Sequence, residues 1–350
     1  MELTPYSLSL SEPLSTARGK ITEREGVVVA VEAHGTTGVG EAAPLPGWTE
    51  PLDECRAALE RARERADDGE GREAALRACA GTSAARHGVA LAYADARARA
   101  SGLPLYRWLG DGEPVDSVPV NATVGDGDRG ATVERAREAV AAGYPAIKLK
   151  VGARDVAVDV ERLAAVRAAC PEVELRVDAN GAWSRAEAEH AFDAIADAGV
   201  DLAYVEQPLP APDLAGLAEL RGRDGGSPPV AVDETLAEHS LAAVLSAGAA
   251  DAVVCKPMVF GGPGRTREAA VRAARAGIRP VVTTTVDGAV ARAGAVHVAA
   301  SLPGIDACGL ATGGLLADDL CPDPFPVENG TVRPGRKEGN IPLSTLGRYA

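Results

Sequence analysis

Short apolar runs alternate with alanine-rich amphipathic segments along the part of the chain that follows Pro114. One run and one amphipathic segment recur about every 25 to 30 residues, which predicts parallel strands joined by crossover helices, and eight such units close into a barrel. An open, doubly wound sheet is the alternative, but the glycine-rich turn that usually follows its first strand is missing from the sequence. The predicted strands are Ser117–Ala122, Ala146–Val151, Glu174–Asp178, Leu202–Glu206, Val230–Asp233, Ala252–Lys256, Pro280–Thr284 and, with the weakest pattern, Cys308–Ala311.

The first hundred residues have a different pattern. Alternation of polar and apolar residues, or β-branched content, predicts three strands, at residues 3–10, Val27–Glu32 and Gly38–Ala43. From Pro51 to about Ala100, apolar residues recur at helical spacing, which predicts two or three helices. The sequence therefore predicts an α/β protein in which an α+β domain, residues 1–100, precedes a (β/α)8-type barrel, residues 115–317.

The chain is acidic, with a formal net charge of −14, and 46% of its 350 residues are hydrophobic. Such a chain can bury a full core, but it offers no basic surface to a nucleic acid or an anionic membrane. No stretch approaches the ~18 apolar residues that span a bilayer, and the first ten residues lack the pattern of a signal peptide. We expect a cytoplasmic protein that binds a small-molecule carboxylate and neither nucleic acid nor membrane; the oligomeric state stays open.

Lysine is nearly absent, because only five of the 36 basic residues are lysines and the rest are arginines. A surface rich in Asp, Glu and Arg keeps a protein hydrated in a salt-rich cytoplasm, so a halophilic source is one hypothesis. A GC-rich genome, which also favours Ala, Gly and Arg, is the alternative. The six cysteines lie far apart, without CxxC pairs or zinc-finger spacing, and we interpret them as reduced core thiols.

Acidic residues recur at the carboxyl ends of the predicted barrel strands, where barrel enzymes build their active sites. Asp178, Glu206 and Asp233 end three successive strands, so their carboxylates should converge. Three hard oxygen ligands with no His or Cys among them suit Mg²⁺, and Mn²⁺ also accepts such ligands. Taken singly, each acid could instead be a salt-bridge or helix-cap partner. The set as a whole predicts a metal site.

Three of the five lysines also lie at strand ends: Lys148, Lys150 and Lys256. Lys148 and Lys150 are two residues apart on one strand and therefore point to the same face. A metal that holds a substrate carboxylate stabilises the charge formed when the neighbouring carbon loses a proton. Like-charge repulsion among clustered ammonium groups near the metal lowers the pKa of a lysine, so that one of them can be neutral and take that proton. We predict Lys150 as the base, Lys148 as a contact of the carboxylate, and Lys256 as a cation across the barrel; a snorkelling lysine is the alternative for each alone.

Weaker candidates surround this set. Asn180 is expected to support the site beside Asp178, and Glu234 to orient Lys256 or a metal ligand. Substrate contacts are predicted for residues at the seventh strand and in one N-terminal loop: Thr283, Thr284, Thr285, Gly288 and Trp48. The three threonines could equally be ordinary β-branched strand residues. No strand end carries a histidine, so solvent-facing positions are expected for His87, His190 and His239.

These motifs resemble the enolase superfamily, and within it the muconate-lactonizing subgroup, whose strands carry Lys-x-Lys, Asp-x-Asn, Glu-Gln-Pro, Asp-Glu and Lys in this order. The same motifs stand here at Lys148–Lys150, Asp178–Asn180, Glu206–Pro208, Asp233–Glu234 and Lys256. Gly38–Pro46 also resembles the capping-domain strand and substrate loop of that subgroup. The resemblance implies that residues 1–100 form a capping domain completed by residues 318–350, and that loops near Ser15–Lys20 and Leu45–Trp48 close over the substrate.

The last part of the barrel is most similar to the o-succinylbenzoate synthase family of menaquinone biosynthesis, over Pro280–Leu302 and Asp306–Leu320. Dipeptide epimerases place Asp-x-Asp on the eighth strand, where this chain has Gly309-Leu310-Ala311. The resemblance implies a Mg²⁺-dependent hydro-lyase that converts 2-succinyl-6-hydroxy-2,4-cyclohexadiene-1-carboxylate to o-succinylbenzoate through an enediolate. The alternatives are an N-succinylamino-acid racemase or another isomerase of the superfamily, such as a dipeptide epimerase or muconate cycloisomerase, and a barrel that only binds ligand.

Overall fold

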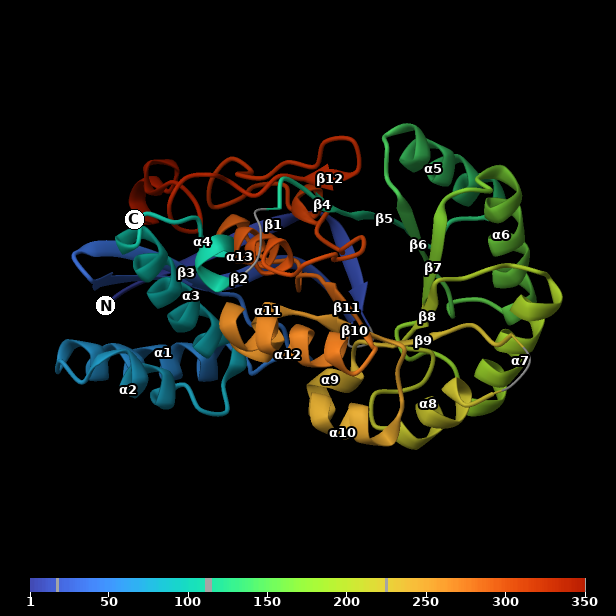
Figure 1. Cartoon of the computed structure of the whole chain (residues 1–350), viewed down its shortest axis with the longest axis horizontal. Helices are drawn as coiled ribbons and strands as arrows, with labels where there is room; N and C mark the ends of the chain where they lie inside the picture. Colours follow the sequence, from blue (N-terminus) through green and yellow to red (C-terminus); the bar gives the residue numbers. More distant parts are fainter. Residues whose placement is uncertain (17–18, 111–114, 224–225, 350) are drawn as a thin grey trace.

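The structure is a computed structural model that describes residues 1–16, 19–110, 115–223 and 226–349. Its N-terminal part begins with an antiparallel sheet in the order β1-β2-β3 (Figure 1). These strands are β1 (Glu2–Thr16), β2 (Gly19–Ala33) and β3 (Thr36–Ala42). The β1–β2 pairing extends to Thr16 opposite Gly19, so most of the loop expected at Ser15–Lys20 belongs to strand ends. Residues 17 and 18 of that expected loop lie outside the described residues.

Three helices follow the N-terminal sheet: α1 (Leu52–Asp67), α2 (Gly71–Ala78) and α3 (Ser83–Ala100). Helix α3 packs directly on β3, and two glycines of β3 make this close approach possible. A Cβ atom at Gly38 would lie 2.1 Å from the carbonyl oxygen of Ala92, and one at Gly40 would lie 2.0 Å from that of Gly88. Larger residues at these two positions would push the helix off the sheet, because real Cβ atoms do not approach backbone this closely.

The second sheet is parallel and curled, in the order β11-β10-β9-β8-β7-β6-β5, with amphipathic helices on its outer side (Figure 1). Its strands are β5 (Asn121–Val124), β6 (Ala146–Lys150), β7 (Glu174–Asp178), β8 (Tyr204–Glu206), β9 (Val230–Val232), β10 (Ala252–Cys255) and β11 (Arg279–Val282). The long helices between and after them are α5 (Arg129–Ala141), α6 (Val156–Ala169), α7 (Arg185–Asp197), α8 (Leu214–Arg221), α10 (Leu241–Ala247), α12 (Pro263–Arg275) and α13 (Ala289–Ala300). Shorter helices are α4 (Leu105–Leu109), α9 (Thr235–Glu238) and α11 (Pro257–Phe260).

The eighth predicted strand, Cys308–Ala311, forms only single bridges, but these bridges close the ring. Cys308 pairs with Val120, between β4 (Val118–Pro119) and β5, and Gly309 pairs with Thr283 at the end of β11. The N–H of Gly309 donates to the carbonyl of Val282 over 2.9 Å. Both edges of the parallel sheet therefore meet at residues 308 and 309, and the (β/α)8-type barrel fold is confirmed.

The C-terminal segment contacts both parts of the molecule. Strand β12 (Thr331–Val332) pairs with β4, and the N–H of Ala317 donates to the carbonyl of Ser9 in β1. The N–H of Leu105 donates to the carbonyl of Gly339 over 2.8 Å. The domain bounds, and the completion of the N-terminal domain by residues 318–350, stay a prediction.

All six cysteines are buried and unpaired, as expected for reduced core thiols. No helix within the described ranges has the length and apolar character needed to cross a membrane.

Candidate active site

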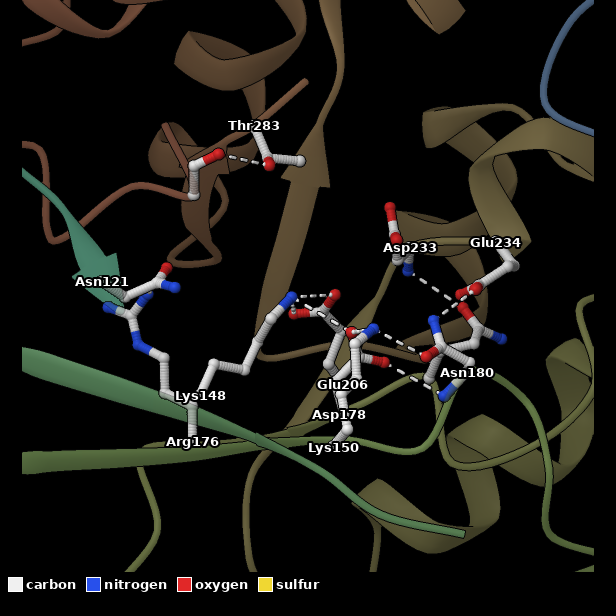
Figure 2. Close-up of polar contacts among 12 residues, drawn as sticks. Asn121, Lys148, Lys150, Arg176, Asp178, Asn180, Glu206, Asp233, Glu234 and Thr283 are labelled. Carbon is white, nitrogen blue, oxygen red and sulfur yellow. Dashed lines mark hydrogen bonds and ion pairs between the residues drawn. The ribbon is translucent and has the colours of Figure 1, made fainter. Parts of the chain in front are cut away.

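Adjacent barrel strands bring the predicted site residues to one rim. In the parallel register Lys150 lies opposite Asp178 on β7, and Asp178 lies opposite Glu206 on β8. Asp233 follows β9 directly, and Lys256 follows β10. Figure 2 shows the lysine and acid side chains from β6 to β9 pointing toward one another at this rim. The strand ends therefore converge, as the sequence spacing predicts.

Two lysines on β6 contact the carboxylates of β7 and β8, and both of them reach Asp178 (Figure 2). The Nζ atom of Lys148 lies 2.7 and 2.9 Å from the two carboxylate oxygens of Glu206 and 3.1 Å from Oδ2 of Asp178. Lys150 donates to Oδ2 of Asp178 and to Oδ1 of Asn180, each over 2.7 Å. The Lys150 side chain is 35% exposed and that of Lys148 14%, so Lys150 is the more open of the two.

The other half of the site is formed by the ends of β9 and β10. Lys256 donates to Oδ2 of Asp233 over 2.7 Å, and its Nζ atom lies 3.1 Å from the centre of the Trp48 ring. Asn180 donates to Oε1 of Glu234 over 3.0 Å. Glu234 therefore bonds Asn180, while the carboxylate that bonds Lys256 is Asp233. Oδ1 of Asp233 and Oε2 of Glu234 are buried without a hydrogen-bond partner.

The charges of the site shift the acidities of its carboxyl groups in opposite directions. Burial raises the pKa of Glu206 to about 7, with a further increase from the charge of Asp178. Burial also raises the pKa of Asp233 to about 6, against the lowering effect of Lys256. For Asp178, burial is outweighed by Lys148 and Lys150, which hold the pKa of this carboxyl well below its usual range. Asp178, which has two lysines beside it, therefore ionises more readily than Glu206 and Asp233, which have one each.

The donor set fits a hard divalent cation. Asp178, Glu206 and Asp233 are at most 4% exposed, lie on three neighbouring strands and offer only oxygen. Within the described ranges no three Asp, Glu, His or Cys side chains are already gathered as a metal centre, and these three carboxylates are paired with lysines. The partner-free Oδ1 of Asp233 and the raised pKa of Glu206 and Asp233 indicate that the neighbouring lysines do not fully compensate the burial of these two carboxyl groups, so a further cation would suit them.

The threonines at the end of β11 make contacts that the sequence left open. Thr283 donates to the carbonyl of Gly309 over 2.7 Å (Figure 2), and the hydroxyl of Thr284 lies 3.0 Å from that of Thr312. These bonds join the seventh strand to the closing segment of the barrel. The N–H of Gly288 donates to Oε1 of Glu41 over 2.8 Å. The N–H of Gly288 is thus bonded to the N-terminal sheet, and its contact with substrate stays a prediction.

Several polar residues of this region were not singled out from the sequence. Arg176 is fully buried inside the barrel, donates to the carbonyl of Ala307 over 2.6 Å and lies over the Tyr204 ring. Arg176 lies two residues before Asp178 on the same strand, and residues two apart on a strand point to the same face. This alternation is the sequence signal that places Arg176 inside the barrel. Asn121 accepts from Arg176 over 3.4 Å (Figure 2).

The expectation that His87 faces solvent is wrong. His87 is 1% exposed, and its Nδ1 atom lies 2.8 Å from the carbonyl oxygen of Glu41. Helix α3 is covered by the N-terminal sheet on one side and by α11 and α13 on others, so this helical position has no solvent face. His190 is exposed, as expected, and His239 is half-buried.

The fold and the rim of lysines and carboxylates define a class of protein: a (β/α)8-type barrel with an N-terminal α+β part. Residues 131–340 match the family model described as Enolase C-terminal domain-like, and residues 1–95 match the one described as MenC, N-terminal domain. The chain belongs to the enolase superfamily, in its muconate-lactonizing subgroup. It is therefore a member of a superfamily of enzymes, which typically use Mg²⁺.

Individual relatives in this superfamily differ in activity. The chain is 30% identical over 322 residues to a chloromuconate cycloisomerase of Delftia acidovorans, covering 88% of this chain and 86% of the relative. It is 40% identical over 216 residues to an o-succinylbenzoate synthase of Mycobacterium bovis, covering 61% and 63%. It is 30% identical over 312 residues to the L-Ala-D/L-Glu epimerase of Bacillus subtilis, covering 86% and 84%. The solved structure of a substrate-liganded complex of that epimerase matches with a TM-score of 0.86 at 27% identity, over 98% of this chain and 97% of the other.

Proposed function

We propose that this enzyme catalyses the dehydration of 2-succinyl-6-hydroxy-2,4-cyclohexadiene-1-carboxylate to o-succinylbenzoate, a step of menaquinone synthesis. The observation that carries the proposal is the match of residues 1–95 to the MenC N-terminal domain, together with 40% identity to an o-succinylbenzoate synthase. The barrel agrees with it, because its closing segment has Gly309 where dipeptide epimerases carry an acid. A Cβ atom at this glycine would lie 2.5 Å from Oγ1 of Thr283, so no side chain fits there without a shift.

In this proposal Asp178, Glu206 and Asp233 hold Mg²⁺. When bound, Mg²⁺ supplies positive charge that stabilises the second negative charge formed on a substrate carboxylate after loss of the neighbouring proton. Asn180 and Glu234 bond each other beside these acids and fix their orientation. Lys148, which already contacts both Asp178 and Glu206, contributes a further positive charge to the carboxylate end of the site.

Lys150 is assigned the proton transfer. In its neutral form its Nζ atom takes the proton from C1 of the ring, and the electron pair of the C–H bond moves into the carboxylate to give an enediolate. The pair then returns to form the C1–C6 double bond, the C6–O bond breaks, and hydroxide leaves with the proton that Lys150 carries. One water is released, the ring becomes aromatic, and Lys150 is neutral again. The greater exposure of Lys150 suits a base that must reach substrate.

Lys256 stays charged on the opposite side in this scheme. It is held by Asp233 and by the Trp48 ring, so its ammonium group is fixed before substrate arrives. A fixed cation stabilises a dianion without having to reorganise during the reaction.

A second candidate is racemisation of N-succinyl amino acids or another isomerisation on the same residues. The observation in its favour is that Lys150 and Lys256 come from β6 and β10, on different sides of the acids, because two lysines on opposite faces suit removal and return of a proton. The 30% identity to an epimerase over 86% of this chain also favours it.

The test is incubation with the cyclohexadiene carboxylate and Mg²⁺, followed by the ultraviolet change on aromatisation. Rapid Mg²⁺-dependent turnover is expected, and N-succinyl amino acids should racemise slowly. Racemisation without any aromatisation would move the assignment to the isomerase. Replacing the proposed base, Lys150, should abolish the aromatisation, and the same substitution at Lys337, an exposed lysine remote from the strand ends, is the matched control.

A further inference from the structure

The loop after β11 contains a strained residue. Val286 has a φ of +60°, in the left-handed region, and it is the one β-branched residue among the non-glycine positive-φ residues of the described chain. Two others of this group also lie close to strand ends of the site: Gln207 directly follows β8, and Asn180 lies two residues after the end of β7. A left-handed conformation is unfavourable for a β-branched residue and persists only where neighbouring groups impose it.

The group that holds Val286 comes from the N-terminal sheet. Arg24, on β2, is 3% exposed, and its Nε donates to the carbonyl of Val286 over 3.1 Å. The N–H of Val286 donates to the hydroxyl of Thr284 over 3.2 Å. Both backbone polar groups of the strained residue are thus hydrogen-bonded, and the carbonyl is bonded by a residue more than 250 positions away in the sequence.

The same guanidinium also holds the loop that carries Trp48. Its two Nη atoms donate to the carbonyls of Ala43 and Pro44, over 2.9 and 3.0 Å. The next residues form a tight turn, in which the N–H of Trp48 donates to the carbonyl of Leu45 over 2.9 Å. A shift at Pro44 is therefore passed to Trp48, whose ring lies on Lys256.

We propose that Arg24 is a positioning residue: by bonding Val286 on one side and Ala43 and Pro44 on the other, it fixes the β11 loop and the Trp48 loop relative to each other over the candidate site. The kinetic part of this inference rests on the proposed dehydration. Glu41 of β3 adds to the contacts between the N-terminal sheet and the segment after β11, because it accepts from the N–H groups of Gly288 and Ala291, each over 2.8 Å. The loop after β11 and the loop that carries Trp48, which are distant in sequence, are thus held in one arrangement.

The first test is Arg24→Met, which keeps the apolar stem and removes all three bonds. KM should rise about tenfold or more while kcat stays within about threefold, since in the proposed function the two loops bind substrate and the base, Lys150, lies on neither of them. Arg24→Lys, which keeps the charge and some donors, should be intermediate and guards against failure of the first variant to fold. Arg56→Met, at a surface arginine whose side chain is 45% exposed, is the control and should leave both constants unchanged.

Val286→Gly tests the strain itself. Glycine adopts a φ of +60° without help, so adding this change to Arg24→Met should lower KM again by about threefold or more. A merely structural role for Arg24 would lower kcat through loss of folded enzyme, and Val286→Gly would not restore KM.

An activity-free measurement separates this inference from the proposed function. The fluorescence difference between a protein and its Trp48→Phe variant isolates Trp48 from the other two tryptophans. Acrylamide should quench this difference signal about twofold more strongly when Arg24 is Met. Unchanged quenching would overturn the proposal even in an enzyme that does not act on the cyclohexadiene, and so would a fall in kcat at constant KM in one that does.

Discussion

The Nζ atom of Lys256 lies 3.1 Å from the centre of the Trp48 ring, which joins a lysine at the end of a barrel strand to a loop of the N-terminal sheet. A cation over an indole face gains about 0.5–2 kcal/mol. Trp48 and Asp233 together hold the ammonium group from two sides. The N-terminal part of the chain therefore completes a site whose charged residues all come from the barrel.

Replacing Trp48 with Leu should lower kcat/KM by about tenfold, because the cation–π contact and the cover over Lys256 are both lost. Steady-state kinetics on the cyclohexadiene substrate measures this. Trp108→Leu is the matched control: Trp108 packs against the core from α4, so its loss should lower the unfolding temperature and leave KM unchanged. Equal kinetic effects of the two changes would contradict the role of Trp48.

Asp233→Asn and Glu206→Gln should each weaken Mg²⁺ binding by about hundredfold or more, since each removes one charged oxygen ligand. Isothermal titration calorimetry of the folded variants checks this, with circular dichroism to confirm the fold. Glu219→Gln is the control, because Glu219 is an exposed acid paired with Arg185 on the barrel surface. Undiminished affinity in either site variant would remove that carboxylate from the metal set.

The affinity for Mg²⁺ should depend on pH. The pKa of Glu206 is about 7 and that of Asp233 about 6, so both carboxyls are largely protonated at pH 5 and a cation must displace their protons. Affinity should therefore rise from pH 5 to about pH 8 and then level off, with protons released during binding near pH 6.5. Calorimetry in buffers of different ionisation enthalpy measures the released protons. Affinity that does not change over this range would contradict the metal assignment of these two acids.

Strand-end charges were predictable from sequence because parallel strands of one barrel share a rim. The spacing of Asp178, Glu206 and Asp233 by about one strand–helix unit was enough to bring them together. The closing segment at Cys308 was harder, since single bridges leave only a weak strand pattern. The spacing of residues along the sequence could not reveal that Lys148 contacts two carboxylates, because the partners of a side chain depend on the twist between neighbouring strands.

The N-terminal contribution to the rim was less predictable. Arg24 lies on a strand among ordinary polar residues, and its three hydrogen bonds go to backbone carbonyl groups. Every residue type has such a carbonyl, so the sequence does not indicate these partners. His87 was misplaced because burial of α3 arises from layers that pack on it from several sides. The sequence therefore predicts the residues of the site that lie in charged motifs at strand ends. It does not predict contacts in which a side chain of the N-terminal sheet bonds backbone carbonyl groups of distant loops.

The assignment of Lys150 as the base is the central claim, and Lys150→Arg tests it most directly. Arginine keeps the positive charge beside Asp178 but cannot take a proton at neutral pH. Aromatisation of the cyclohexadiene carboxylate by this variant, followed by its ultraviolet change with saturating Mg²⁺, should be slower than in the wild type by about a thousandfold or more, with the fold and Mg²⁺ affinity retained. A rate within about tenfold of the wild type would contradict the account.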